Sequence, residues 1–189
     1  MVFAVLLLLA PVAAAGQVRF VEVARQVGID YVHENGASPA KRLPETNGAG
    51  SAFLDWDGDG DQDLYLVNSG HMVDGRGDHW NRLYRNDGGV FARVAAAGGA
   101  RGASYGMGVA AADYDADGDP DLYLTAWGPD QLYRADPGGY TDVTESAGLG
   151  HPGWTTSAAF FDGDGDGDLD LVAAQYVRFE LGQQPWCGR

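Results

Sequence analysis

The chain carries three copies of one acidic pattern, in which aspartate occupies every second position over nine residues. Apolar residues stand close before and after each copy. Five carboxylates within nine residues repel one another, so each of them needs a partner. The fifteen residues are Asp55, Asp57, Asp59, Asp61, Asp63, Asp113, Asp115, Asp117, Asp119, Asp121, Asp162, Asp164, Asp166, Asp168 and Asp170.

These aspartates also account for the net charge of the chain. The 189 residues include 27 acidic and 12 basic side chains, which gives a formal charge of -15. Without the fifteen aspartates, 12 acids (27 minus 15) would face 12 bases. The acidity is therefore concentrated in three short segments of an otherwise neutral body. Because an acidic protein repels phosphate backbones, nucleic acid is not an expected partner.

The acidic segments belong to a longer repeat, since they start 58 and then 49 residues apart. Two further elements recur in step with them. One reads aromatic-x-x-Val-x-x-x-x-Gly and starts at Phe20, Phe91 and Tyr140. The other is Leu-Tyr-Arg, at residues 83–85 and 132–134. A unit of about 49 residues has the size of a propeller blade, in which ~40–50 residues form four strands.

Short apolar, aromatic and β-branched runs flank the acidic segments. Residues 52–54 lead into the first segment and residues 64–67 leave it, and residues 158–161 and 171–173 do the same at the third. Runs of this kind, bounded by Gly and Asp, predict two strands joined by a hairpin loop. The sequence therefore predicts an all-β fold with about three blades of four-stranded antiparallel sheet.

The spacing of the aspartates predicts a calcium site in each hairpin loop. Ca²⁺ takes six to eight oxygen ligands. We expect the side chains at positions 1, 3 and 5 of the nine to converge, and the aspartate at position 9 to close the site. Position 7 would contribute its backbone carbonyl, with its side chain facing solvent. The glycines at position 6, which permit a sharp turn, are Gly60, Gly118 and Gly167.

Three alternatives to a calcium loop are weaker. An EF-hand needs a glutamate at position 12 and flanking helices, but that position holds Leu66, Leu124 and Ala173. Mg²⁺ prefers fewer protein ligands and more water. A solvated acidic turn without metal would not need three copies in one register. We therefore expect up to three Ca²⁺ ions, one in each loop.

Other polar and aromatic residues show no catalytic pattern. The histidines have no spacing typical of a zinc site, and no two of the remaining acids pair convincingly as general acid and base. We therefore expect no enzymatic activity. Trp80, Trp127 and Trp154 could line a carbohydrate or protein contact surface, although packing between blades is the simpler interpretation. Trp56 and Tyr114, at position 2 of their loops, should pack over the loop.

The loops and their flanking elements resemble the FG-GAP/VCBS repeats of integrin-type β-propellers. The Leu-Tyr-Arg and aromatic elements resemble more specifically the ASPIC/UnbV-type proteins, the group that includes cartilage acidic protein. This resemblance covers residues 17 to about 180. It implies that the repeats are blades of a seven-bladed or similar ring, and that positions 1, 3, 5 and 9 of each loop hold Ca²⁺.

The two ends of the chain carry their own expectations. Residues 1–15 read as a signal peptide, with an apolar run and an A-x-A site. The alternatives are a membrane anchor or a buried strand, although the run is short of the ~20 residues that span a bilayer. Residues 16–189 form the incomplete propeller. Cys187 has no partner cysteine in the chain. Because propellers have ~4–8 blades, we expect an N-terminal fragment, with a complete protein of three stacked hairpins as the alternative.

Together these features predict a secreted, periplasmic or cell-surface protein without a membrane span in its mature form. Its calcium would be structural, and its role would be recognition or adhesion toward an extracellular protein or carbohydrate. The alternative function is that of a non-catalytic part of a calcium-dependent propeller enzyme acting on polysaccharide.

Overall fold

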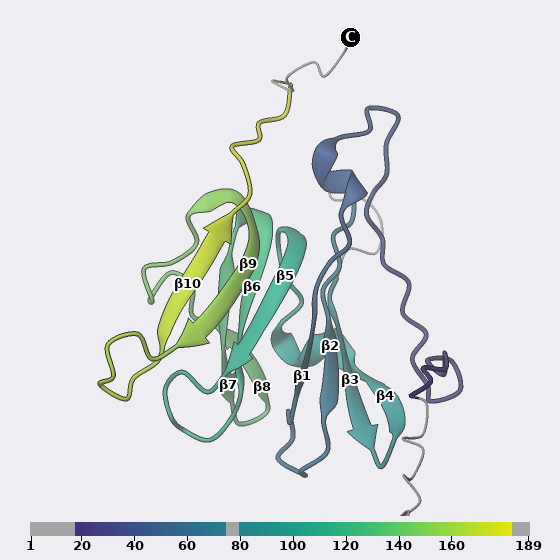
Figure 1. Cartoon of the computed structure of the whole chain (residues 1–189), viewed down its shortest axis with the longest axis vertical. Coiled ribbons are helices and arrows are strands. Elements are labelled where there is room, and N and C mark those ends of the chain that lie inside the picture. Colours follow the sequence, from purple (N-terminus) through teal and green to yellow (C-terminus); the bar gives the residue numbers. More distant parts are fainter. Residues whose placement is uncertain (1–17, 75–79, 183–189) are drawn as a thin grey trace, which may run out of the picture.

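The computed structural model describes residues 18–74 and 80–182, and it shows an all-β chain in two antiparallel sheets (Figure 1). The first sheet contains β1 (Ser51–Leu54), β2 (Asp63–Leu66), β3 (Arg82–Asp87) and β4 (Val90–Val94), in that order. The second contains β5 (Tyr105–Ala112), β6 (Asp121–Pro129), β7 (Gln131–Asp136), β8 (Gly139–Asp142), β9 (Pro152–Phe161) and β10 (Asp170–Gln175). Two short 3-10 turns accompany them, η1 (Leu43–Thr46) and η2 (Ala95–Gly99).

The strand pairing resolves the sheets into blades. The strands β1–β4 form blade one, and β5–β8 form blade two, each by antiparallel pairing of neighbours in sequence. The two blades share one register, since Leu64 lies opposite Tyr84 and Leu122 lies opposite Tyr133. The propeller-like architecture and the hairpins predicted around each acidic segment are confirmed.

The third unit corrects the expected count of complete blades. It contributes the hairpin β9–β10 alone, and this hairpin joins blade two through the end of β6, where Trp127 pairs with Trp154. Within the described residues the chain thus has two four-stranded blades and one two-stranded half-blade. The strand order explains the difference, because the third and fourth strands of a unit follow its hairpin in sequence, and β10 ends at Gln175. The predicted signal peptide and Cys187 lie outside the described residues.

Blades one and two bury the main hydrophobic core between them. The innermost strands β1, β5 and β9 lie side by side, as Figure 1 shows, and the faces of neighbouring blades pack together behind them. Leucine and tyrosine from both blades fill the contact: Leu54, Tyr65, Leu83, Leu122, Tyr133 and Tyr140. Burial of such large side chains contributes about 1.5–3 kcal/mol each, so the packing of blade on blade holds the fold together.

Glycines let the inner strands approach closely. A Cβ at Gly106 would lie 2.4 Å from the carbonyl oxygen of Asn68 and 2.5 Å from Cγ1 of Val67. A Cβ at Gly50 would lie 3.0 Å from the Cα of Gly108. The backbones of the two blades therefore meet at distances that no larger side chain permits.

Candidate metal centres

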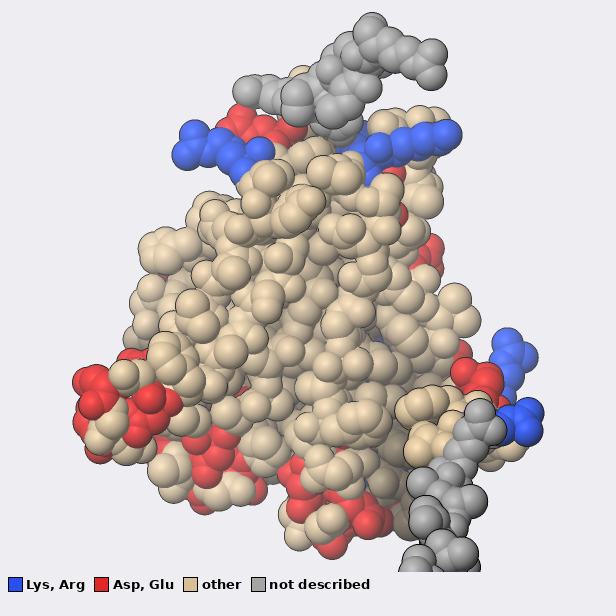
Figure 2. Space-filling view, in the orientation of Figure 1, with Lys and Arg blue, Asp and Glu red and all other residues tan. Residues whose placement is uncertain are grey.

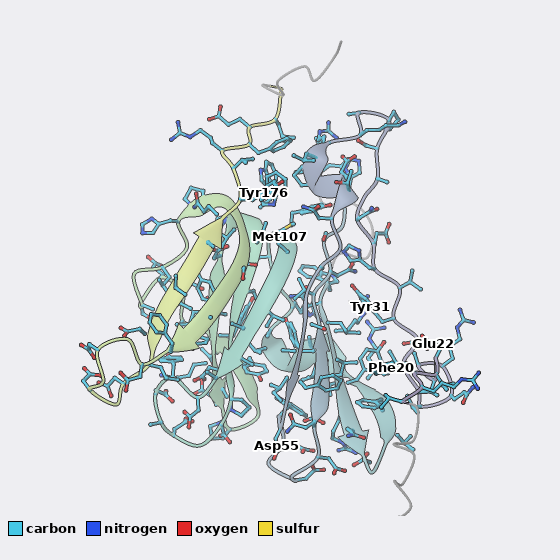
Figure 3. All side chains as sticks on the ribbon, in the orientation of Figure 1. Phe20, Glu22, Tyr31, Asp55, Met107 and Tyr176 are labelled. Carbon is cyan, nitrogen blue, oxygen red and sulfur yellow. The ribbon has the colours of Figure 1, made fainter. Side chains whose placement is uncertain are left out.

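The three acidic loops lie at one end of the molecule. Loop one (residues 55–63), loop two (113–121) and loop three (162–170) connect the first and second strands of successive blades. Figure 2 shows them as red patches along the lower edge, and Asp55 marks the first of them in Figure 3. The inner strands run in the same direction in every unit, so the hairpin geometry brings the fifteen aspartates to one rim.

Carboxylate oxygens converge within each loop. In loops one and two the converging residues stand at positions 1, 3 and 9, and in loop three at positions 1, 3 and 5. The ligand atoms of each group lie within 4.8 Å of one another. The three groups are Asp55, Asp57 and Asp63; Asp113, Asp115 and Asp121; and Asp162, Asp164 and Asp166. The arrangement offers oxygen ligands only, as a hard cation such as Ca²⁺ requires.

The carboxylate at position 1 fixes the turn of its loop. Asp55 accepts hydrogen bonds from the backbone amides of Asp59 (3.1 Å) and Gly60 (3.0 Å). Asp113 accepts the equivalent bonds from Asp117 and Gly118, at 3.0 and 2.9 Å. The position-6 glycine adopts a φ of 92° in loop one and 101° in loop two, which a glycine reaches without strain.

The position-5 and position-7 residues interact with each other in all three loops. The position-7 amide donates to the position-5 carboxylate at 2.8, 3.0 and 2.9 Å in loops one to three. The expected solvent-facing position-7 side chain holds for the exposed Asp119 and Asp168. Asp61 is half-buried, and its carboxylate accepts a hydrogen bond from the amide of Gly88 at 2.7 Å because the β3–β4 turn reaches loop one.

The aspartate at position 9 has a structural role that the sequence did not indicate. Asp63 is fully buried, and its two oxygens accept hydrogen bonds from the amides of Trp56 and Asn86, both at 2.7 Å. Asp121 is equally buried and accepts from Tyr114 at 2.9 Å and Ala135 at 2.8 Å. The carboxylate thus ties the loop to the third strand of its own blade.

Loop three lacks the second of these bonds. Asp170 is exposed and accepts from the amide of Gly163 at 2.9 Å, and no third strand follows β10 within the described residues. The converging group of loop three also differs, since it includes position 5 in place of position 9. Loop three is the most exposed of the three loops.

Burial and neighbouring carboxylates raise the pKa of two of these aspartates. Burial, followed by the nearby charges of Asp59 and Asp63, raises the pKa of Asp57. Burial raises the pKa of Asp121 to about 6, although backbone hydrogen bonds from Ala135 and Tyr114 oppose the shift. A cation among these oxygens would favour their ionised forms.

The arginine of the Leu-Tyr-Arg element lies on the strand next to the loop. Arg85 Nε stands 3.8 Å from Asp57 Oδ2, and Arg85 also pairs with Asp87 at 2.7 Å. Arg134 occupies the same place in blade two and pairs with Asp136 at 2.9 Å. These pairs are partly exposed and contribute little energy. The recurrence of the element was visible in the sequence, but the place of its arginine follows only from the strand register.

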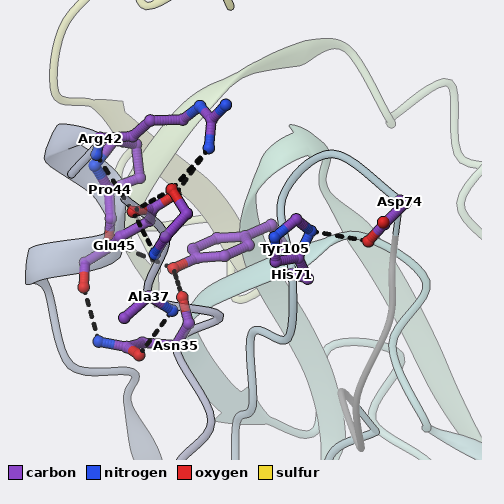
Figure 4. A network of polar contacts seen from close by, with 9 residues as sticks. Asn35, Ala37, Arg42, Pro44, Glu45, His71, Asp74 and Tyr105 are labelled. Atoms are coloured by element: carbon purple, nitrogen blue, oxygen red, sulfur yellow. Dashed lines mark hydrogen bonds and ion pairs between the residues drawn. The ribbon is translucent and has the colours of Figure 1, made fainter. Parts of the chain in front are cut away.

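The opposite end of the molecule carries a polar network around Glu45 (Figure 4). Glu45 is buried and accepts hydrogen bonds from the Ser38 hydroxyl at 2.8 Å and from Arg42 Nη1 at 2.9 Å. Burial alone raises the pKa of Glu45, but the bonds from Ser38 and Arg42 together hold it below its ordinary value. The Tyr105 hydroxyl donates to the Asn35 carbonyl at 2.8 Å beside it. Sequence patterns did not indicate this network, because Glu45 has no acid–base partner in them.

Trp127 packs against the buried cluster that contains Trp154, as the simpler interpretation expects, whereas Trp80 is 39% exposed and its ring lies 5.5 Å from the Arg101 guanidinium. Trp154 is buried and meets Tyr176 and Phe179 edge to face, with ring centroids 5.1 and 5.5 Å apart. Tyr114 stacks on Phe160 at 6.5 Å, so the position-2 aromatic of loop two packs between blades.

Comparison with known proteins agrees with the repeat structure. The FG-GAP-like repeat family matches residues 55–124 and again residues 113–173. Each match begins at one acidic loop, includes the next acidic loop and ends in the strand that follows it. No curated protein matches the chain. Within residues 18–74 and 80–182, no helix is long and apolar enough to cross a membrane. The matched segments span well over half of the chain and coincide with the blades described above, and the chain therefore belongs to the FG-GAP-like repeat family.

Proposed function

We propose that the chain is a calcium-binding segment of a β-propeller, in which each acidic loop binds one Ca²⁺ for structural purposes. The observation that carries this proposal is the convergence of three carboxylates in each loop within 4.8 Å. A bound Ca²⁺ would supply the positive charge that such a group lacks. The ligands would come from positions 1, 3, 5 and 9, with the backbone carbonyl of position 7.

Calcium would act on stability, because binding free energy becomes folding free energy when the unfolded chain has no site. At a free Ca²⁺ concentration one hundred times the Kd, each independent site adds about 2.7 kcal/mol. An affinity of about 10⁻⁴–10⁻³ M suits an extracellular module. The hydrogen bonds at positions 1 and 9 hold the loops in shape, and binding would bring in the carboxylates that lie outside the converging groups, at position 5 in loops one and two and at position 9 in loop three.

We further propose that the segment serves recognition or adhesion outside the cell, without catalysis, and that its partner is an extracellular protein or carbohydrate. The two ends of the molecule support this proposal because they differ. The loops at the acidic rim are suited to metal. The opposite end carries the Glu45 network and the aromatic group around Trp154. The ASPIC/UnbV assignment also belongs to this proposal. It is supported by the recurrence of its two sequence elements on equivalent strands, β3 with β7 and β4 with β8.

A melting experiment tests the calcium proposal. The full chain is unfolded thermally in 10 mM Ca²⁺, in 10 mM Mg²⁺ and in EDTA. We expect the highest Tm in Ca²⁺, with a gain of several degrees, since 1 kcal/mol shifts the Tm of a domain of this size by about 2–4 °C. The double variant D55N/D57N should lose part of the gain, whereas E180Q, which changes one exposed acid outside the loops, should keep it. Equal Tm values in Ca²⁺ and EDTA would contradict the proposal.

A further inference from the structure

A buried carboxyl group lies beside the junction between blade two and the third unit. Asp130 stands between β6 and β7, outside the acidic loops, and is 4% exposed. It follows directly on the three residues of β6 that pair with β9, which are Trp127, Gly128 and Pro129. The hairpin β9–β10 therefore joins blade two next to this carboxyl group.

Three hydrogen-bond donors surround the Asp130 carboxyl. The amide of Ala126 donates to Oδ1 at 2.9 Å, and the hydroxyl of Tyr123 donates to Oδ2 at 3.0 Å. The third donor is the side chain of Thr155, which comes from β9 and is 1% exposed. Asp130 is thus bonded to the third unit as well as to its own blade.

No positive charge among the described residues balances this carboxyl. Tyr123 is the titratable group that faces it from β6, and burial holds the pKa of the Tyr123 hydroxyl above its ordinary value, so the hydroxyl keeps its proton. Thr155, on β9, does not titrate. The segment after β8 passes the backbone of Asp130, but its titratable residues Glu145 and His151 are exposed. Burial without a counter-charge disfavours an ionised carboxylate.

Blade one has the same site with a neutral residue. Asn81 precedes β3 as Asp130 precedes β7. The Asn81 Oδ1 accepts a hydrogen bond from the amide of Asn68, and its Nδ2 donates to the Tyr65 hydroxyl, both at 2.8 Å. Tyr65 has the place in β2 that Tyr123 has in β6. The site therefore accommodates a neutral group that donates to the tyrosine, as a protonated carboxyl can.

The third unit differs at the residue that faces this site. Gly106 of β5 and Thr155 of β9 occupy equivalent places, since each lies at the register shift of its strand. A Cβ at Gly106 would lie 2.4 Å from the carbonyl oxygen of Asn68, so that junction has no room for a side chain. Thr155 instead supplies a side-chain donor to Asp130. The ionisable residue and its donor from the next unit thus occur together, at one of the two junctions.

The balance of burial and hydrogen bonding decides which form of Asp130 the fold prefers. Burial raises the pKa of Asp130, and the three hydrogen bonds reduce the rise without cancelling it. When the pKa of a carboxyl is higher in the folded state, the ionised form costs stability at every pH above that folded pKa. The cost declines as the pH falls through the folded pKa, and it is gone below the unfolded value, near 3.9.

We propose that Asp130 is a proton-dependent latch between blade two and the third unit, and that it holds the hairpin β9–β10 more firmly when its carboxyl is protonated. Separation of the hairpin removes Thr155 and uncovers Asp130, so the separated state releases the proton. Acidification therefore favours the docked hairpin. This device does not depend on calcium.

An NMR titration of the full chain measures the protonation of Asp130 directly. The ¹³C shift of its carboxyl is followed in the original chain, in T155V and in the original chain unfolded by urea. We expect a higher midpoint in the folded chain than in urea, and a higher one again in T155V, which lacks the donor from the third unit. A folded midpoint at or below the unfolded one would overturn the proposal, and so would a T155V midpoint that does not rise.

Hydrogen exchange of the β9 amides measures the docking of the hairpin. D130N gives the site the residue of blade one, whereas the control E145Q removes an exposed acid nearby. From pH 7.5 to pH 4.5, after correction for intrinsic exchange, protection should rise at least about threefold more in the original chain than in D130N. E145Q should respond as the original chain does. Equal responses of the original chain and D130N would contradict the latch, and the NMR titration decides the proposal even where D130N does not fold.

Discussion

At the scale of single residues, position 4 of the acidic loops shows a conformational cost that one loop carries alone. Gly58 and Gly165 occupy this position with φ values of 73° and 79°, and Ala116 occupies it in loop two with a φ of 58°. Left-handed backbone costs an L-residue about 1–2 kcal/mol. Loop two therefore contains strain that the other two loops avoid.

We predict that A116G stabilises the chain by about 0.5–1 kcal/mol. Glycine adopts the left-handed backbone without strain, but it also raises the conformational entropy of the unfolded chain, which offsets part of the gain. Urea unfolding in EDTA measures the change. The matched control is A92G in β4, where the backbone φ is negative and the side chain is exposed; it should destabilise by about 0.5–1 kcal/mol. A destabilised A116G would contradict the prediction.

The position-9 aspartates provide a second comparison between loops. Asp63 accepts two backbone amides in a buried place, whereas exposed Asp170 accepts one. Leaving amides without an acceptor costs about 1–3 kcal/mol. In EDTA, where no metal contributes, we expect D63A to lower the free energy of unfolding by about 1–3 kcal/mol more than D170A. Equal losses in urea unfolding would show that the buried hydrogen bonds do not stabilise the blade.

The position-9 aspartates also show which part of the site the sequence does not predict, namely their hydrogen-bond partners. The alternation of aspartates identified the loops, because their partners are local. The amides that hold Asp63 and Asp121 come in part from Asn86 and Ala135, 23 and 14 residues away, and only the strand register brings them there. Glu45 is a similar case, since its burial depends on how the segment before β1 folds back on itself.

At the scale of elements, the close approach of blade two to blade one depends on glycine. A methyl group at Gly106 would meet the backbone of Asn68 at 2.4 Å, whereas one at Gly48 would meet nothing within 4 Å. We predict that G106A destabilises the chain by about 1–3 kcal/mol, as overpacking does, and that G48A changes stability by less than about 0.5 kcal/mol. Thermal unfolding of the pair in one buffer measures this. Equal stability of the two variants would show that the blades can separate without cost.

The hairpins were the most predictable elements. Each lies between two apolar runs with an acidic loop in the middle, and both signals are local in sequence. The joining of β9–β10 to the end of β6 was not predictable, because the pairing of Trp127 with Trp154 connects two units.

At the scale of the whole molecule, the acidity is a property of one rim. All fifteen alternating aspartates lie in the three loops, and the rest of the chain is neutral by count, with 12 acids and 12 bases. One Ca²⁺ in each loop would change the formal charge from -15 to -9 (-15 plus three times 2). The net charge therefore describes the three acidic loops and not a general surface character.

The stoichiometry of calcium binding tests this account most directly. The full chain is stripped with EDTA, dialysed and titrated with Ca²⁺ in a calorimeter. We predict three bound ions per chain, and two for the variant D162N/D164N, in which loop three, the most exposed of the loops, loses two of its three converging carboxylates. An absence of binding heat up to about 10 mM Ca²⁺, ten times the weakest expected Kd, together with an unchanged Tm, would contradict it.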